Sequence, residues 1–251
     1  MANYGLVLSG GAARGIAHIG VLKALEELNL KPSAISGVSA GALVGAFYAA
    51  GYNPDQIFST LMKTNVLRML RPAMNRMAIL KLDRTASLIN RYLPKKIEDL
   101  KIPFTVNTTD LNTGFSEYFS EGEILKPLQA SCAIPIIFDP IIIHHHHHID
   151  GGLLNNLPVE PFLGLKKILG VHVNPKNTQY ENISMKKIAE RSFSLALSHN
   201  VQARKLQCDF LIEPNELAKY SLFEISKAEQ MFEIGYNETM KNKTSILQIF
   251  G

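Results

Sequence analysis

Cysteine is scarce in this chain of 251 residues, which contains only Cys132 and Cys208. The two do not form a CxxC pair, and no secretory context accompanies them. The sequence therefore supports neither a disulfide framework nor a cysteine-ligated zinc site. We expect both thiols to be reduced.

Long apolar runs are missing as well. The two most apolar stretches, 40–50 and 134–143, are too short to span a bilayer, and two prolines and an aspartate interrupt the second. The first strand is expected to begin by Tyr4, which leaves no room ahead of it for a signal peptide. We therefore expect a cytoplasmic protein without a transmembrane helix.

Clustered charge of one sign is also lacking. The chain has 26 lysines and arginines against 22 aspartates and glutamates, a formal net charge of +4, without the basic stripe that nucleic-acid binding usually needs. This mild surplus fits peripheral contact with an anionic membrane surface, and nucleic acid is not an expected partner.

With 46% hydrophobic and 19% charged residues, the composition is that of a soluble globular protein. The length suits one domain over residues 1–251.

Apolar patterns of strand and helix type alternate along the chain, which indicates an α/β protein with a mostly parallel sheet and helices on both faces. The patterns predict strands at 4–8, 34–37, 103–109, 141–149, 167–173 and 209–212, and helices at 16–28, 40–50, 123–131, 184–207 and 224–241. A turn at Asn112, Thr113 and Gly114 predicts a hairpin between the strand 103–109 and a strand through Tyr118.

One segment departs from this regular alternation. Residues 54–93 have an irregular helical pattern in which methionines are interleaved with arginines and a lysine. We interpret this segment as a cap or lid over the domain.

The strongest local motif is Gly37-Val38-Ser39-Ala40-Gly41, a G-x-S-x-G between a short predicted strand and a helix. This context is typical of a nucleophile elbow, in which Ser39 is exposed on a tight turn. Gly37 and Gly41 remove side chains that would clash there, and the helix start favours developing negative charge. A small-residue turn without a chemical role is the competing interpretation.

A glycine-rich loop, Gly10-Gly11-Ala12-Ala13-Arg14-Gly15, follows the first predicted strand. Successive backbone N–H groups at a helix start can bind an anion, so residues 10–14 are candidates for an oxyanion hole. The loop also matches a dinucleotide-binding fingerprint, which needs an acidic residue at the end of the next strand. The strand 34–37 provides none and leads to Ser39 instead, which favours the oxyanion hole.

A serine nucleophile needs a base, and Asp150 is the candidate. It ends an apolar strand, and Gly151 and Gly152 after it allow a sharp turn and close approach to Ser39. A turn aspartate without a catalytic role is equally common before two glycines.

Histidine is the usual base for a catalytic serine, but no histidine is well placed. Of the two that follow Asp150, His172 lies inside a predicted strand and His199 inside a long predicted helix. We expect both to be structural, and His18 on the first predicted helix to be a packing residue.

The run His144 to His148 is unusual. Alternation along a strand would place His144, His146 and His148 on one face, near enough to hold a metal ion. A consecutive run is more typical of a tolerated loop or an engineered tag, and we expect no carboxylate cluster to join it. The expectation is therefore that the chain has no catalytic metal, whereas the sequence leaves open whether the run itself is native, engineered or metal-binding.

Taken together, these motifs resemble the patatin-like phospholipase family. The resemblance is carried by Leu8 to Gly15, Ala17 to Leu22, Gly37 to Gly41, and Asp150-Gly151-Gly152, which occur in the family's order. Additional matches lie at 102–104, 109–110, 131–135 and 153–158. The similarity covers most of the chain and is weakest at 54–93.

This resemblance implies a three-layer α/β/α fold and hydrolysis of lipid acyl esters through an acyl-serine, with no cofactor. It implies that Ser39 attacks, that Asp150 takes the proton in a dyad without histidine, and that Gly10, Gly11 and Ala12 with their neighbours bind the oxyanion. One departure is Ala12, where the family has a third glycine; it matters if the position requires a positive φ. The histidine run replaces a hairpin of varied sequence.

Two other functions remain open from the sequence. A noncatalytic lipid-binding module could dock on membranes through its segment rich in Met and Arg. An acyltransferase would share the elbow and differ only in the acceptor that attacks the acyl-serine.

Overall fold

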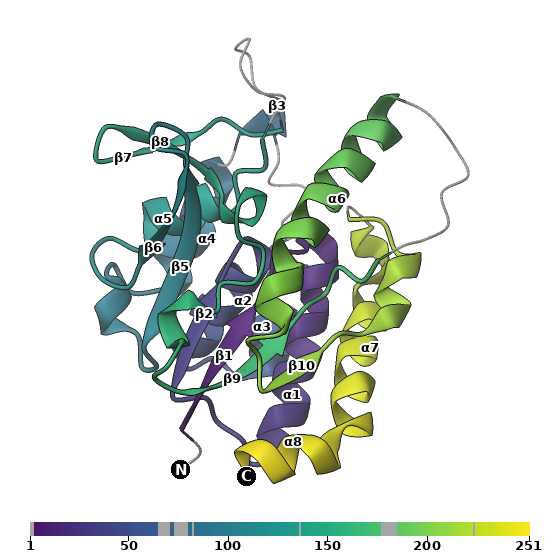
Figure 1. Cartoon of the computed structure of the whole chain (residues 1–251). Coiled ribbons are helices and arrows are strands. Elements are labelled where there is room, and N and C mark those ends of the chain that lie inside the picture. Colours follow the sequence, from purple (N-terminus) through teal and green to yellow (C-terminus); the bar gives the residue numbers. More distant parts are fainter. Residues whose placement is uncertain are drawn as a thin grey trace.

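The computed structural model describes residues 3–64, 71–72, 80–81, 83–135, 137–176, 185–222 and 224–251 (Figure 1). None of the helices among these residues is both long and apolar enough to cross a membrane.

The described strands form an eight-stranded mixed sheet. Its order is β10 (Phe210–Ile212), β9 (Lys167–Val171), β1 (Tyr4–Leu8), β2 (Ala34–Gly37), β5 (Phe104–Asp110), β8 (His146–Asp150) and β7 (Ile141–Ile143), with β6 (Phe115–Phe119) paired to β5. Neighbours from β10 to β5 are parallel, whereas β6, β8 and β7 pair antiparallel. The mostly parallel sheet is confirmed, and its antiparallel end carries Asp150.

Helices cover both faces of this sheet, as a three-layer α/β/α fold requires (Figure 1). Alternate side chains of β1 enter two separate cores. Leu6 and Leu8 pack into the larger core with α1 (Ala17–Glu27), α2 (Ala40–Ala49), α7 (Ala228–Lys241) and α8 (Lys243–Phe250). Val7 faces the smaller core, where it meets Phe162 and Val201 of α6 (Met185–Lys205).

The predicted lid segment begins and ends in helices that belong to the larger core. Ile57 and Leu61 of α3 (Pro54–Thr64) are buried there, as are Leu88 and Ile89 of α4 (Asp83–Tyr92). Between them, Arg71–Pro72 and Leu80–Lys81 form a short antiparallel pair, β3 with β4. Residues 65–70, 73–79 and 82 lie outside the described residues, and the lid stays a prediction.

Most predicted elements appear within a few residues of their expected bounds. The predicted hairpin is formed by β5 and β6, and α5 (Leu125–Ser131) follows it. A 3-10 turn, Ala12–Ile16, precedes α1, and the predicted strand 167–173 ends at Val171. Helix α8 was not expected, because the pattern of 224–241 gave no sign that a second helix follows Asn242.

The predicted strand at 141–149 is wrong in one respect. The chain reverses at His144 and His145, which have φ of 48° and 69°, so β7 and β8 form a hairpin. Two successive residues with positive φ are what a tight two-residue hairpin needs, and histidine tolerates this region better than most residues.

Candidate active site

Ser39 stands at the sharp bend between β2 and α2. Its backbone has φ 53° and ψ −126°, a conformation rarely adopted by residues other than glycine, and its side chain is 7% exposed. The bend brings backbones so close that a Cβ at Gly37 would lie 2.7 Å from the Gly41 carbonyl oxygen, and one at Gly41 would lie 2.4 Å from that of Leu8. Both glycines are therefore required by sterics, as the motif predicted.

Asp150 meets Ser39 at the end of β8. Both residues line one small cavity, and the Asp150 carboxylate accepts a hydrogen bond at 2.8 Å from the amide of Gly152. Burial raises the pKa of Asp150 to about 7, although the Ser39 side chain and the Gly152 amide both act to lower it. The carboxyl group is thus poised to gain or lose a proton near neutral pH.

Gly10, Gly11 and Ala12 line a small cavity of about 20 Å³ that Ser39 and Asp150 also line. Among the described residues, the amides of these three loop residues donate to no other group. They are therefore available to an anion beside the serine hydroxyl.

The other two residues proposed for the oxyanion hole serve the loop itself. The amide of Ala13 donates to Leu222 O at 2.9 Å, and that of Arg14 donates to Gly11 O at 3.0 Å. The Arg14 guanidinium donates to Tyr220 O through Nε at 2.9 Å. The expectation that Ala13 and Arg14 offer free amides is therefore wrong; they fix the loop to residues 220–222.

Ala12 adopts the left-handed conformation that its family position suggested, with φ of 46°. Alanine bears a steric cost there that glycine avoids, roughly 1–2 kcal/mol per residue. Ala12 nevertheless lines the cavity beside Ser39. The substitution therefore places steric strain in a loop that borders the site.

Ser131 is a site residue that sequence reasoning missed. Its hydroxyl accepts from the Ser39 amide at 2.8 Å and donates to Asn107 O at 2.8 Å. This chain of contacts ties the bend at Ser39 to β5 and leaves the Ser39 amide unavailable to an oxyanion. The only sequence signal was the motif 131–135, which assigned Ser131 no role.

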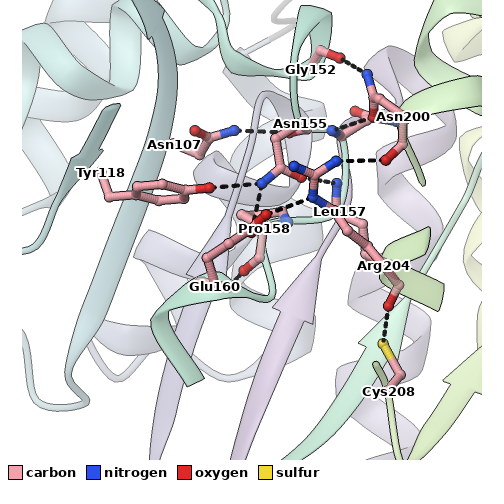
Figure 2. A network of polar contacts seen from close by, with 12 residues as sticks. Asn107, Tyr118, Gly152, Asn155, Leu157, Pro158, Glu160, Asn200, Arg204 and Cys208 are labelled. Atoms are coloured by element: carbon pink, nitrogen blue, oxygen red, sulfur yellow. Dashed lines mark hydrogen bonds and ion pairs between the residues drawn. The ribbon is translucent and has the colours of Figure 1, made fainter. Parts of the chain in front are cut away.

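An asparagine network holds the loop that follows Asp150 (Figure 2). Asn200 of α6 donates to Gly152 O at 2.9 Å and accepts from the Asn156 amide at 2.9 Å. Asn107 of β5 donates to Asn155 O at 2.8 Å. Side chains from β5 and α6 thus fix both sides of the loop.

The histidines considered as triad members lie elsewhere. His172 is buried and its Nδ1 lies 2.9 Å from Glu213 Oε1, while His199 is exposed on α6. His18 Nε2 lies 2.8 Å from Ser9 O. Within the described part of the chain, no histidine lines either cavity beside Ser39.

The second cavity beside Ser39 is larger and almost entirely apolar, with a volume of about 160 Å³. Leu43 and Val44 of α2, Leu61 and Met62 of α3, and Phe138 line it. Such a cavity, open next to a serine hydroxyl, suits an unbranched hydrocarbon chain.

The residues next to the histidine run differ from those expected from the sequence. Asp110 and Glu117 lie beside His148, with ligand atoms within 4.8 Å of one another. The expectation that no carboxylate cluster joins the run is therefore wrong, because the hairpins β5–β6 and β7–β8 bring distant residues to one place.

The family model described as Patatin-like phospholipase matches residues 6–163, which include the loop, the bend at Ser39 and Asp150. The chain belongs to the patatin-like phospholipase family. In this patatin-like chain, residues 164–251 lie beyond the matched region and supply β9, β10 and α6 to α8.

Curated relatives agree with this membership, and one solved structure shares the fold. An uncharacterized NTE family protein of Mycobacterium tuberculosis is 36% identical over 172 residues, 67% of this chain and 48% of that protein. Lysophospholipase nte1 of Aspergillus fumigatus is 34% identical over 168 residues, 64% of this chain and 11% of that protein. The crystal structure of VipD from Legionella pneumophila shares the fold at a TM-score of 0.58 and 16% identity, covering 98% of this chain and 67% of that one. The chain spans about half the length of the mycobacterial relative.

Ala12→Gly should stabilise the protein. Relief of the left-handed strain outweighs the extra chain entropy of glycine, for a net gain of about 0.5–1 kcal/mol in the free energy of unfolding. Urea denaturation of both proteins measures the difference. Ala13→Gly is the matched control and should destabilise, since it removes a buried methyl group. Equal destabilisation by both variants would contradict the strain assigned to Ala12.

Proposed function

We propose that this chain is a serine acyl hydrolase that cleaves lipid acyl esters through an acyl-serine intermediate. Ser39 is the nucleophile, Asp150 is the general base, and the amides of Gly10, Gly11 and Ala12 form the oxyanion hole. No histidine and no cofactor take part.

The observation that carries this proposal is that Ser39 and the buried carboxyl residue Asp150 line the same small cavity, where the Ser39 side chain acts to lower the pKa of Asp150. A serine hydroxyl needs a base within hydrogen-bond reach, and a base works best when its pKa is near the working pH. With a pKa of about 7, Asp150 meets this requirement. The free amides beside the hydroxyl support the placement of the oxyanion.

In the first half-reaction, Ser39 Oγ attacks the ester carbonyl carbon while Asp150 takes the hydroxyl proton. The carbonyl oxygen becomes an oxyanion, which the loop amides and the start of α2 stabilise. The intermediate then expels the alcohol, which leaves with the proton from Asp150. An acyl-serine and an ionised Asp150 remain.

In the second half-reaction, water attacks the acyl-serine and Asp150 takes a proton from it. A second oxyanion forms in the same hole and collapses as the Ser39 oxygen leaves. That oxygen recovers the proton from Asp150. The products are a fatty acid and an alcohol, and the enzyme returns to its starting state.

The apolar cavity supports an acyl chain as the substrate group bound next to Ser39. Its lining includes Leu61 and Met62 of α3 and Thr85 of α4. Because both helices belong to the segment 54–93, their position supports the proposal that this segment acts as a lid on the acyl site and determines chain-length preference.

Ser39→Ala and Asp150→Asn should each lower ester hydrolysis by at least about a thousandfold, since each removes a group on which the other depends. Hydrolysis of short acyl esters measures the rates, and a fluorophosphonate probe should label wild type at Ser39. His199→Ala, which alters an exposed histidine, is the control and should retain full activity. Hydrolysis and labelling that survive Ser39→Ala would refute the nucleophile assignment.

The pH dependence of kcat/KM should follow the ionisation of Asp150. The base must be unprotonated, and its pKa is raised from 3.8 to about 7. Activity should therefore be full above about pH 8 and fall roughly tenfold per pH unit well below pH 7. Stopped-assay rates from pH 5 to 9 test this, with circular dichroism to confirm folding at each pH. A flat profile between pH 5 and 8 would contradict the assignment of Asp150 as the base.

Leu43→Phe should shift preference toward shorter acyl chains, because the larger ring fills part of a cavity of about 160 Å³. A loss of two or three buried methylenes costs about 0.8 kcal/mol each, or roughly ten- to fiftyfold in kcat/KM for long chains. A series of p-nitrophenyl esters measures the shift. Leu165→Phe, at an exposed position, is the control. An unchanged chain-length profile would place the acyl chain elsewhere.

A further inference from the structure

Three strands present polar side chains on one face of the sheet at its antiparallel end. Asp110 of β5 lies opposite His148 of β8, and Thr108 of β5 lies opposite Glu117 of β6. Since side chains two residues apart on a strand share a face, Thr108 and Asp110 point the same way, together with the residues opposite them. Asp110, Glu117 and His148 therefore converge from three strands.

The convergence is close and partly shielded from water. Ligand atoms of the three side chains all lie within 4.8 Å of one another. Asp110 and His148 are 3% and 1% exposed, and Glu117 is partly exposed beside a cavity that all three line. Two carboxylates at this separation, with limited access to water, repel each other unless a positive charge lies between them.

The imidazole of His148 is oriented as a metal-binding histidine would be. Its Nδ1 lies 3.1 Å from Thr108 Oγ1, and its Nε2 lies 3.6 Å from Glu117 Oε2. A neutral imidazole has one lone pair. When Nδ1–H donates to Thr108, the lone pair on Nε2 faces a carboxylate. A lone pair and a carboxylate repel each other, whereas a cation between them would be bound by both.

Asp110 also has structural partners. Asp110 shapes the β5–β6 turn, where it accepts from the Asn112 amide at 2.8 Å and from Thr113 Oγ1 at 2.8 Å. This explains why an aspartate ends β5. His146 Nδ1 also lies 2.7 Å from Asp110 Oδ2, so Asp110 has an ion-pair partner within the histidine run. Glu117 takes no part in this turn, and its Oε2 lies 3.6 Å from His148 Nε2.

The donors indicate which ion fits. Imidazole together with carboxylates suits Zn²⁺ and its neighbours, whereas Mg²⁺ and Ca²⁺ prefer oxygen ligands alone. Tetrahedral Zn²⁺ holds its ligands roughly 3.3 Å apart, which a rotamer change of the partly exposed Glu117 can reach. His144 lines the same cavity, as does His146, whose Nδ1 lies 2.7 Å from Asp110 Oδ2; either can supply a fourth ligand.

We propose that Asp110, Glu117 and His148 bind a divalent transition-metal ion, best matched by Zn²⁺, at a site separate from the Ser39 cavity. The site does not depend on the proposed hydrolase activity. The ion joins β5, β6 and β8 two residues before Asp150, which lies opposite Thr108 in the sheet. Its expected role is to stiffen the strand that carries Asp150.

Zinc titration of the full chain, with a chromophoric chelator as competitor, tests the site. Wild type should bind one Zn²⁺ that Glu117→Gln and His148→Asn each weaken by at least about tenfold, the scale seen when even an outer-shell partner is lost. Bound Zn²⁺ should raise the melting temperature of wild type more than that of Glu117→Gln, and Mg²⁺ should not. Circular dichroism confirms that each variant is folded.

The control is the double variant His145→Asn with His147→Asn, which removes two exposed members of the histidine run. It should bind Zn²⁺ within about twofold of wild type, because neither residue belongs to the ligand set. If instead the control loses binding and Glu117→Gln retains it, the exposed histidines alone hold the ion and the proposal is wrong. Failure of wild type to bind Zn²⁺ would overturn it as well.

Discussion

The meeting of Ser39 and Asp150 at one cavity depends on β5, the strand between the two that carry them. Gly37 of β2 lies opposite Val106, and Asp150 of β8 lies opposite Thr108. Two residues beyond Gly37, the bend at Ser39 therefore reaches the level of Thr108 from the other side. Any shift in the register of β5 would separate hydroxyl and carboxylate, which is why Ser131 and Asn107, both bonded to this region, matter to the site.

This arrangement holds two unfavourable states that the surrounding contacts maintain. Ser39 keeps a backbone conformation that costs energy, and Asp150 is an ionisable group without access to water. Burial without full compensation is the reason that the pKa of Asp150 rises. The asparagine network around Gly152 and Asn155 fixes the backbone next to these groups (Figure 2). A rigid backbone at this point keeps Ser39 and Asp150 in the positions that the proposed reaction needs.

Local motifs predicted the parts of the site that depend on short-range geometry. Gly37, Ser39 and Gly41 were identifiable because a tight bend restricts residue type within five positions, and the alternating apolar patterns located most strands. Features that depend on distant pairing were not predictable. The amide of Ala13 is taken by Leu222, more than 200 residues away, and Asp110 meets His148 only because two hairpins pack side by side. The reversal at His144 and His145 was hidden because histidine is not a usual turn residue.

The clamp on the glycine-rich loop comes from outside the region that the family model matches. Tyr220 and Leu222 supply the carbonyl oxygens that hold Arg14 and Ala13, and Leu222 also borders both cavities beside Ser39. The residues that carry the motifs are thus an incomplete folding unit. A fragment ending at residue 163 would lack β9, which pairs with β1, and also the residues that anchor the glycine-rich loop. A change in residues 220–222 would therefore alter the position of the loop without altering any motif.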